Sequence, residues 1–175
     1  MAKHFNITSG LTQELLAPGD SAKVSNIQLA NMSHSGISFG SDSSIVDLYI
    51  EKKLTGKFYL LKQIKIPHGA TLTHSLKGFN NRANEFGLYI KLHAATTFTL
   101  TGSIDPAAST TVPGSGTKFL TELNIGDEIV VSSETRVVSA IASDTSLTVS
   151  LAFSDNSNDA TPDCNPIGLV DVIIN

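Results

Sequence analysis

The chain ends with "GLVDVIIN", residues 168–175, and this stretch decides how the rest of the sequence is interpreted. Its alternate residues Val170, Val172 and Ile174 are apolar, and Asp171 lies between the first two, which is the pattern of a half-buried β-strand. An acidic loop that contains prolines, "SDNSNDATPDCNPI", comes directly before it. Nothing follows the strand within these 175 residues, so we expect its pairing partner to lie far back in the sequence.

Length and composition are those of a globular protein. A chain of 175 residues allows one domain or two small ones, and 41% apolar residues can form an ordinary core. The longest apolar runs are only a few residues, so we expect no transmembrane helix and no membrane partner. The N-terminal "MAKHFNITSG" lacks the apolar core of a signal peptide, so we expect the protein to stay in the cytoplasm of the cell that makes it. The lone Cys164 excludes an intrachain disulfide and a cysteine-rich metal site.

Charge is divided unevenly along the chain. Residues 1–102 contain ten Lys or Arg and six Asp or Glu, a net charge of +4, whereas residues 103–175 contain two and ten, a net charge of −8. Such a split indicates two units with different surroundings. The lysines of the basic part are dispersed, and only Lys52 and Lys53 are adjacent, so the pattern predicts no nucleic-acid partner.

Short strands separated by Gly, Ser, Asn and Pro dominate the basic part. In residues 44–54, "SIVDLYIEKKL", apolar side chains alternate with polar or aromatic ones. Similar alternation predicts two strands around the turn "PHG" in residues 57–76 and another strand in "FGLYIKLHA", residues 86–94. "LTQELLAPGD", residues 11–20, offers one short helical turn before its proline and glycine. Strands of this length and spacing predict an all-β fold, an antiparallel sandwich.

The sequence changes character from about residue 103. "SIDPAASTTVPGSGT", residues 103–117, is small, polar and broken by prolines. Residues 127–153, "DEIVVSSETRVVSAIASDTSLTVSLAF", contain three short alternating strands. Strands of this length predict a small barrel or curled sheet, which would be a second module.

Two parts of the chain resemble sequence patterns of known protein families. "SNIQLANMSHSGISFGSDSSIVDLYIEKK", followed by "FYLLKQIKIPHGATL", resembles a sandwich pattern recurrent in structural proteins of tailed bacteriophages, in which "-LAN" leads to "VDLYI", "YLLK" and "IP-G-TL". Residues 109–159 are similar to a module common in phage tail, fibre and virion proteins. Its marks here are "G-GT-F-TEL--GD-I", "ETR-V--I-SDTSLTV" and "AFS". The resemblance implies a structural role and brings no catalytic motif.

Together these observations predict a discontinuous layout. Residues 1–102 plus 166–175 would form an Ig-like β-sandwich in which "GLYIKL" and "VDVIIN" are neighbouring late strands. Residues 103–165 would form a small β-barrel-like domain inserted between them, an arrangement that requires only that its two ends lie close together. The alternative is two domains in tandem, with "VDVIIN" completing the second.

Motifs that suggest chemistry lack the context that the chemistry needs. "GISFG", residues 36–40, matches a G-x-S-x-G nucleophile elbow, but another strand follows it where a helix is required. "DNSND", residues 155–159, suggests a calcium loop, yet Ala160 and Pro166 stand where Gly and a bidentate Glu are needed. No short-range pairing that would mark a metal site occurs among the five histidines, His4, His34, His68, His74 and His93. We therefore predict no catalytic residue, no metal site and no cofactor.

Two tyrosines are the candidate site residues. Tyr49 and Tyr89 occupy the face opposite the apolar one in their strands, where they could serve as exposed anchors of a protein interface. The equally supported alternative is that they cover a sheet edge or pack under a loop. With no Trp and 6% aromatic residues, a carbohydrate-binding module is a minor option.

The resulting expectation is a non-enzymatic virion structural protein of a tailed bacteriophage. Within the particle we favour an accessory capsid decoration or cement protein that binds the major capsid protein and forms homo-oligomers. A neck, collar, tail or fibre-attachment component is the first alternative. A receptor- or carbohydrate-binding adsorption module is the second, and an enzyme is the weakest class.

Overall fold

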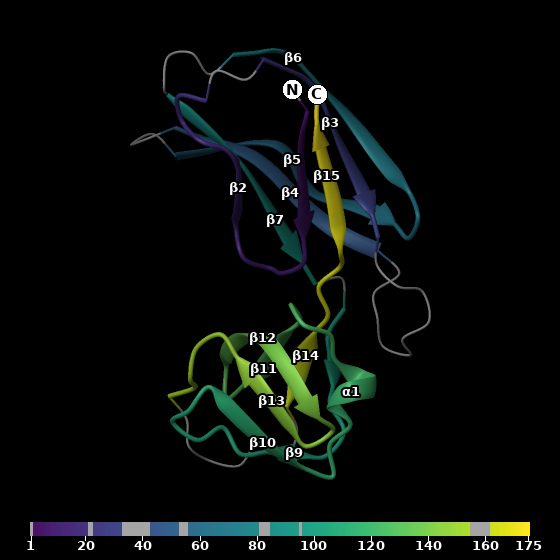
Figure 1. Cartoon of the computed structure of the whole chain (residues 1–175), viewed down its shortest axis with the longest axis vertical. Coiled ribbons are helices and arrows are strands. Elements are labelled where there is room, and N and C mark those ends of the chain that lie inside the picture. Colours follow the sequence, from purple (N-terminus) through teal and green to yellow (C-terminus); the bar gives the residue numbers. More distant parts are fainter. Residues whose placement is uncertain are drawn as a thin grey trace.

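The computed structural model describes residues 2–20, 23–32, 43–52, 56–80, 85–94, 96–154 and 162–175. It is an all-β structure of antiparallel sheets, as the sequence predicts, arranged in two lobes (Figure 1). No helix in these ranges is long and apolar enough to cross a lipid bilayer.

The C-terminal strand lies inside the first sheet. The order of this four-stranded sheet is β1 (Lys3–Ile7), β15 (Val170–Ile174), β3 (Lys23–Asn31) and β6 (Thr71–Asn80). Val172 lies opposite Phe5 on one side and Leu29 on the other, so β15 separates two strands from the beginning of the chain. The expected distant partner is therefore the N-terminal part of the sequence.

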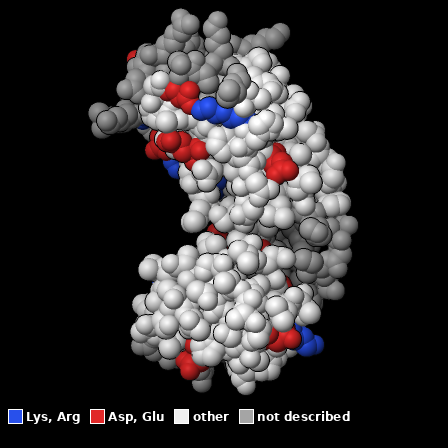
Figure 2. All heavy atoms as spheres, in the orientation of Figure 1, with Lys and Arg blue, Asp and Glu red and all other residues white. Residues whose placement is uncertain are grey.

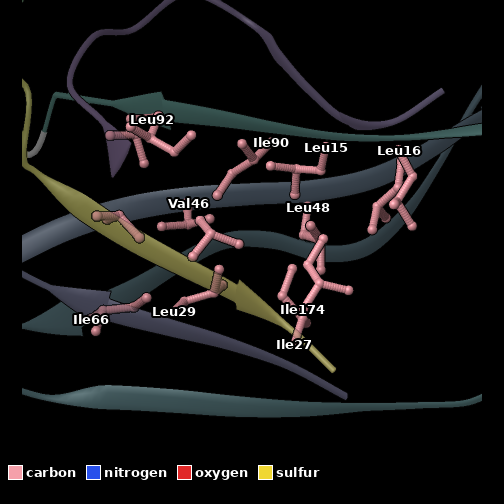
Figure 3. Packing of buried hydrophobic residues seen from close by; sticks show 14 of the residues in the cluster. Leu15, Leu16, Ile27, Leu29, Val46, Leu48, Ile66, Ile90, Leu92 and Ile174 are labelled. Atoms are coloured by element: carbon pink, nitrogen blue, oxygen red, sulfur yellow. The ribbon is translucent and has the colours of Figure 1, made fainter. Parts of the chain in front are cut away.

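The second sheet packs against the first to make the sandwich. It contains β2 (Gln13–Leu16), β7 (Phe86–His93), β4 (Ser43–Lys52) and β5 (Gly56–Pro67), in this order. Alternate apolar residues of both sheets, among them Val46, Leu48 and Ile174, point into one shared core (Figure 3). Each such aliphatic side chain contributes about 1.5–3 kcal/mol on full burial. The strands expected to be neighbours, β7 and β15, therefore belong to facing sheets and are not paired.

Within residues 11–20, Gln13–Leu16 form strand β2 where the sequence suggested a helical turn. Glu14 pairs with Tyr89 and Leu16 with Leu88, and a bulge at Leu15 lies between the two pairs. The bulge lets the consecutive leucines both enter the core, where they are 2% and 1% exposed. Burial of this pair overrides the weak local preference for a turn.

The second lobe is a seven-stranded sheet. Its order is β8 (Phe98–Thr99), β14 (Asp163–Asn165), β11 (Glu128–Val131), β12 (Glu134–Ser143), β13 (Ser146–Val149), β10 (Thr111–Ser115) and β9 (Ser103–Ile104). Together with the short helix α1 (Phe119–Glu122), the sheet encloses a hydrophobic core of its own. The core includes Leu100, so this lobe begins before the predicted boundary at residue 103. We call residues 98–165 the small unit and the other lobe the sandwich unit.

The two units meet in a tight joint near the β1–β2 connection. A Cβ atom on Gly126, whose φ is +101°, would lie 1.7 Å from the carbonyl oxygen of Thr8. Gly10 lies beside the Glu128 carboxylate and the Ile167 side chain, which are side-chain neighbours. At Gly126 only glycine fits, because there the two backbones meet.

Candidate functional site: the exposed edge of the sandwich

Strand β5 exposes aromatic and basic side chains together. It ends its sheet, with β4 as its neighbour on one side. Phe58 is 51% and Tyr59 44% exposed, and three lysines are exposed on the same strand: Lys57, Lys62 and Lys65. An edge strand that carries exposed aromatic side chains offers contact area to another protein. We call these five residues the β5 edge.

Three tyrosines form a row across the outer face of the sheet. Tyr49 on β4 is stacked on Tyr89 of β7, with ring centroids 5.7 Å apart, and lies 5.5 Å from the ring of Tyr59 on β5. The expected exposure of Tyr49 is wrong, because the side chain is only 2% exposed. The neighbouring rings and Lys57 cover it. Tyr89 is half-buried, and Tyr59 is the member of the row that faces solvent.

Lysine side chains lie over this row. The Lys57 ammonium stands 4.6 Å from the centre of the Tyr49 ring and also donates a 3.3 Å hydrogen bond to its hydroxyl. That hydrogen bond raises the pKa of Lys57, so the group stays charged at neutral pH. Lys62 lies 5.0 Å from the centre of the Tyr59 ring. Such cation–π contacts hold positive charge against the aromatic surface.

At the opposite end of the row, a carboxylate holds Tyr89. The Tyr89 hydroxyl donates a 3.0 Å hydrogen bond to Glu14 Oε2. Burial raises the pKa of Tyr89, and the neighbouring Glu14 raises it further. The row therefore runs from an acidic end at β2 to a basic end at β5.

A bulge shapes the middle of β5. Gln63 has a φ of +50°, and its backbone N–H donates a 2.7 Å hydrogen bond to Asp47 Oδ1 instead of continuing the ladder. The other carboxylate oxygen of Asp47 lies 2.8 Å from His93 Nε2. This polar pair fixes the bulge, and the bulge bends the free edge of the strand.

Contacts within the small unit explain its recurring sequence motifs. Glu134 of "ETR" binds Arg136 and Ser154, and the Arg136 Nε–H donates to the Ala152 carbonyl in "AFS". These contacts join two parts of the motif that lie far apart in sequence. We interpret these sequence motifs as determinants of the fold.

The acid of "GD" has a similar structural role. Asp127 Oδ2 accepts a 2.8 Å hydrogen bond from the Asn124 N–H, and Gly126 before it has the positive φ that its turn requires. In "GT-F", Thr117 donates its hydroxyl proton to the Asp144 carbonyl. Both contacts close loops inside the unit.

The other sequence candidates do not form a site in the described ranges. "GISFG" and "DNSND" lie outside them. Within them, no group of three or more His, Cys, Asp or Glu side chains is arranged to hold a metal ion. Cys164 is buried, and burial raises its pKa, so its thiol stays protonated.

The sequence reasoning missed Phe58 and Tyr59. A signal was present, because "KFYLLKQIK" mixes apolar and basic residues without a clean period of two. Loss of alternation is what a strand exposed at the sheet edge permits.

Comparisons with protein-family models, with curated proteins and with solved structures found no match.

Proposed function

We propose that this chain is a non-enzymatic structural protein of a tailed-bacteriophage particle, which works by binding and assembly. The observation that carries the proposal is the β5 edge, where exposed aromatic rings lie beside lysines on an otherwise well-packed sandwich. Such a surface suits contact with another protein, because the rings supply buried area and the lysines attract acidic partners. The resemblance of two segments to phage structural proteins supplies the setting.

Within the particle, the favoured role is an accessory decoration or cement protein on the capsid surface. The charge division supports it, since a basic sandwich can rest on an acidic protein surface while the acidic small unit points away. A neck, collar, tail or fibre-attachment component is the alternative, because modules like the small unit also occur in such proteins.

The test is the copy number of the chain in purified particles, measured by quantitative mass spectrometry against the major capsid protein. A copy number in a fixed ratio to the many copies of the major capsid protein supports the decoration role. A number that matches one ring of the neck, tail or fibres supports the alternative. Absence of the chain from washed particles would overturn the structural role.

A receptor- or glycan-binding role in adsorption is favoured by one observation, the exposure of Tyr59 beside Phe58. Glycan-array binding by the purified chain, lost in Tyr59→Ala, would support this role. Its test uses Tyr59 because Tyr49 is covered.

A further inference from the structure

Two of the three lysines of the β5 edge have no acidic partner in the described part of the chain, whereas Lys57 lies opposite Glu51 on β4. Lys62 and Lys65 form no ion pair with any described acidic residue, and β5 itself contains no Asp or Glu. The long lysine side chains can lay their methylene groups along a partner while their ammonium groups seek a carboxylate. The missing partner is therefore an acidic surface with room for a long side chain.

Such a surface lies on the small unit. A shallow hollow of about 250 Å³ opens between β9 and β10 and is lined by Ser103, Ile104, Asp105, Pro113, Gly114 and Ser115. Asp105 is exposed, and its carboxylate forms no hydrogen bond or ion pair with the residues that the structure describes. We call this the Asp105 hollow. β9 is the last strand of its sheet, so the hollow lies at a free edge.

The two surfaces lie on different lobes. Figure 1 shows β9 and β10 at the end of the small unit that points away from the sandwich. Figure 2 shows the two lobes in outline, with an indentation between them on one side. A basic edge on one lobe and the Asp105 carboxylate at the far end of the other could meet when two copies of the chain come together.

We propose that copies of this chain associate head to tail, with the β5 edge of one copy bound in the Asp105 hollow of the next. The inference rests on the proposed function, because it assigns a partner to the same β5 surface. Lys65 or Lys62 supplies the ammonium group that meets Asp105. Phe58 and Tyr59 supply the apolar contact beside it.

The bent edge disfavours a symmetric pairing of two β5 strands. Such pairing would place lysine-bearing strands against each other with no acid on either, and like charges opposite each other destabilise a sheet. The bulge at Gln63 also interrupts the straight edge that strand pairing requires. Contact between unlike surfaces is heterologous, so it builds a ring where the rotation closes and a filament where it does not.

The experiment is sedimentation velocity of the purified full chain over a concentration series, first at about 0.1 M and then at about 1 M NaCl. Between these conditions the Debye length falls from about 10 to about 3 Å. We expect concentration-dependent association at low salt that weakens at least about tenfold at high salt, because exposed charges are screened. A chain that stays monomeric at low salt throughout the series overturns the proposal.

Two charge-reversed variants test the direction of the contact. Lys62→Glu/Lys65→Glu alters only the β5 edge, and Asp105→Lys alters only the hollow. Each variant alone is expected to stay monomeric, because its edge and its hollow then carry charge of the same sign. A mixture is expected to regain assembly in alternating copies, since each of its two contacts again pairs a lysine with a carboxylate. Self-association of either variant at the wild-type level contradicts the proposal.

Two controls keep the result interpretable. Lys118→Glu makes the same kind of charge change on an exposed lysine of the small unit and should leave association in place. Thermal melts confirm that each variant is folded.

A photo-crosslinking residue at position 58 should label the β9–β10 region of a second copy. Labelling of a second sandwich unit would contradict the head-to-tail contact.

The outcome separates this inference from the proposed function. Copies found in particles, together with a chain that never self-associates, would remove the head-to-tail contact and leave the structural role intact. Self-association of a chain that is absent from particles would support the head-to-tail contact and overturn the structural role.

Discussion

The backbone N–H of Ile167 donates a 2.8 Å hydrogen bond to Oδ1 of Asp127, and this bond joins the two units of the molecule. Ile167 packs in the sandwich core, whereas Asp127 stands in the turn before β11 of the small unit. The carboxylate is 2% exposed, and its burial raises the pKa of Asp127 despite the hydrogen bonds it accepts. The joint therefore contains an acid that is disfavoured in its charged form.

This acid predicts a pH dependence of stability. A carboxyl group whose folded pKa is raised binds more protons in the folded state, so its contribution to stability falls as pH rises from the unfolded pKa, near 3.8, through the raised value. Asp127→Asn removes this titration. Urea unfolding of both proteins across the acidic range should show wild-type stability declining relative to the variant as pH rises. Parallel curves would contradict the raised pKa.

Gly126→Ala should destabilise the protein strongly. The new Cβ would fall 1.7 Å from the Thr8 carbonyl oxygen, so the joint must open in addition to bearing the positive φ. We expect a loss on the order of 3 kcal/mol in the free energy of unfolding, measured with urea. Gly116→Ala is the matched control: its φ is +66° and nothing lies within 4 Å, so it should cost only about 1 kcal/mol. Equal losses would mean that contact at the joint adds nothing.

Replacing residues 98–165 with a short glycine linker should leave a folded sandwich. Phe98 pairs with Cys164 across β8 and β14, so the chain enters and leaves the small unit at neighbouring points, about 5.5 Å or less apart between Cα atoms. The two hydrophobic cores also share no residue. Far-UV circular dichroism and a cooperative thermal transition test this. An unfolded product would show that the sandwich depends on the small unit.

The tyrosine row predicts two different effects of alanine substitution. Tyr49→Ala should lower the free energy of unfolding by about 3 kcal/mol, because it empties a nearly fully buried site. Tyr59→Ala should change stability by less than about 1 kcal/mol and weaken self-association in sedimentation. Tyr49→Phe keeps the covered ring and should leave association unchanged. Loss of association in this variant, while it stays folded, would contradict the division between Tyr49 and Tyr59.

Cys164 provides a test of local opening in the small unit. The thiol is fully buried, and burial raises its pKa, so a thiol reagent such as DTNB should react only when this unit opens. The labelling rate should rise in Glu134→Gln, which weakens the contacts with Arg136 and Ser154. Immediate reaction of the native chain would contradict the burial.

Sequence patterns predicted the strands whose alternation is clean and missed features set by tertiary contacts. The all-β class and the distant pairing of "VDVIIN" followed from period-two patterns and from the acidic loop before the last strand. The exposure of Tyr49 could not be predicted, because the covering rings and Lys57 come from strands that only the fold brings together. Strand β2 was hidden because its burial depends on the bulge at Leu15.

The place of β15 between β1 and β3 also sets an order of events during synthesis. The whole small unit emerges from the ribosome before residues 170–174 do, and its sheet contains only strands from residues 98–165. The small unit can therefore fold first, whereas the first sandwich sheet lacks an inner strand until residues 170–174 are made. During that interval β1 has no partner within its sheet. A nascent chain thus acquires its acidic lobe before β15 completes the first sheet of the basic lobe.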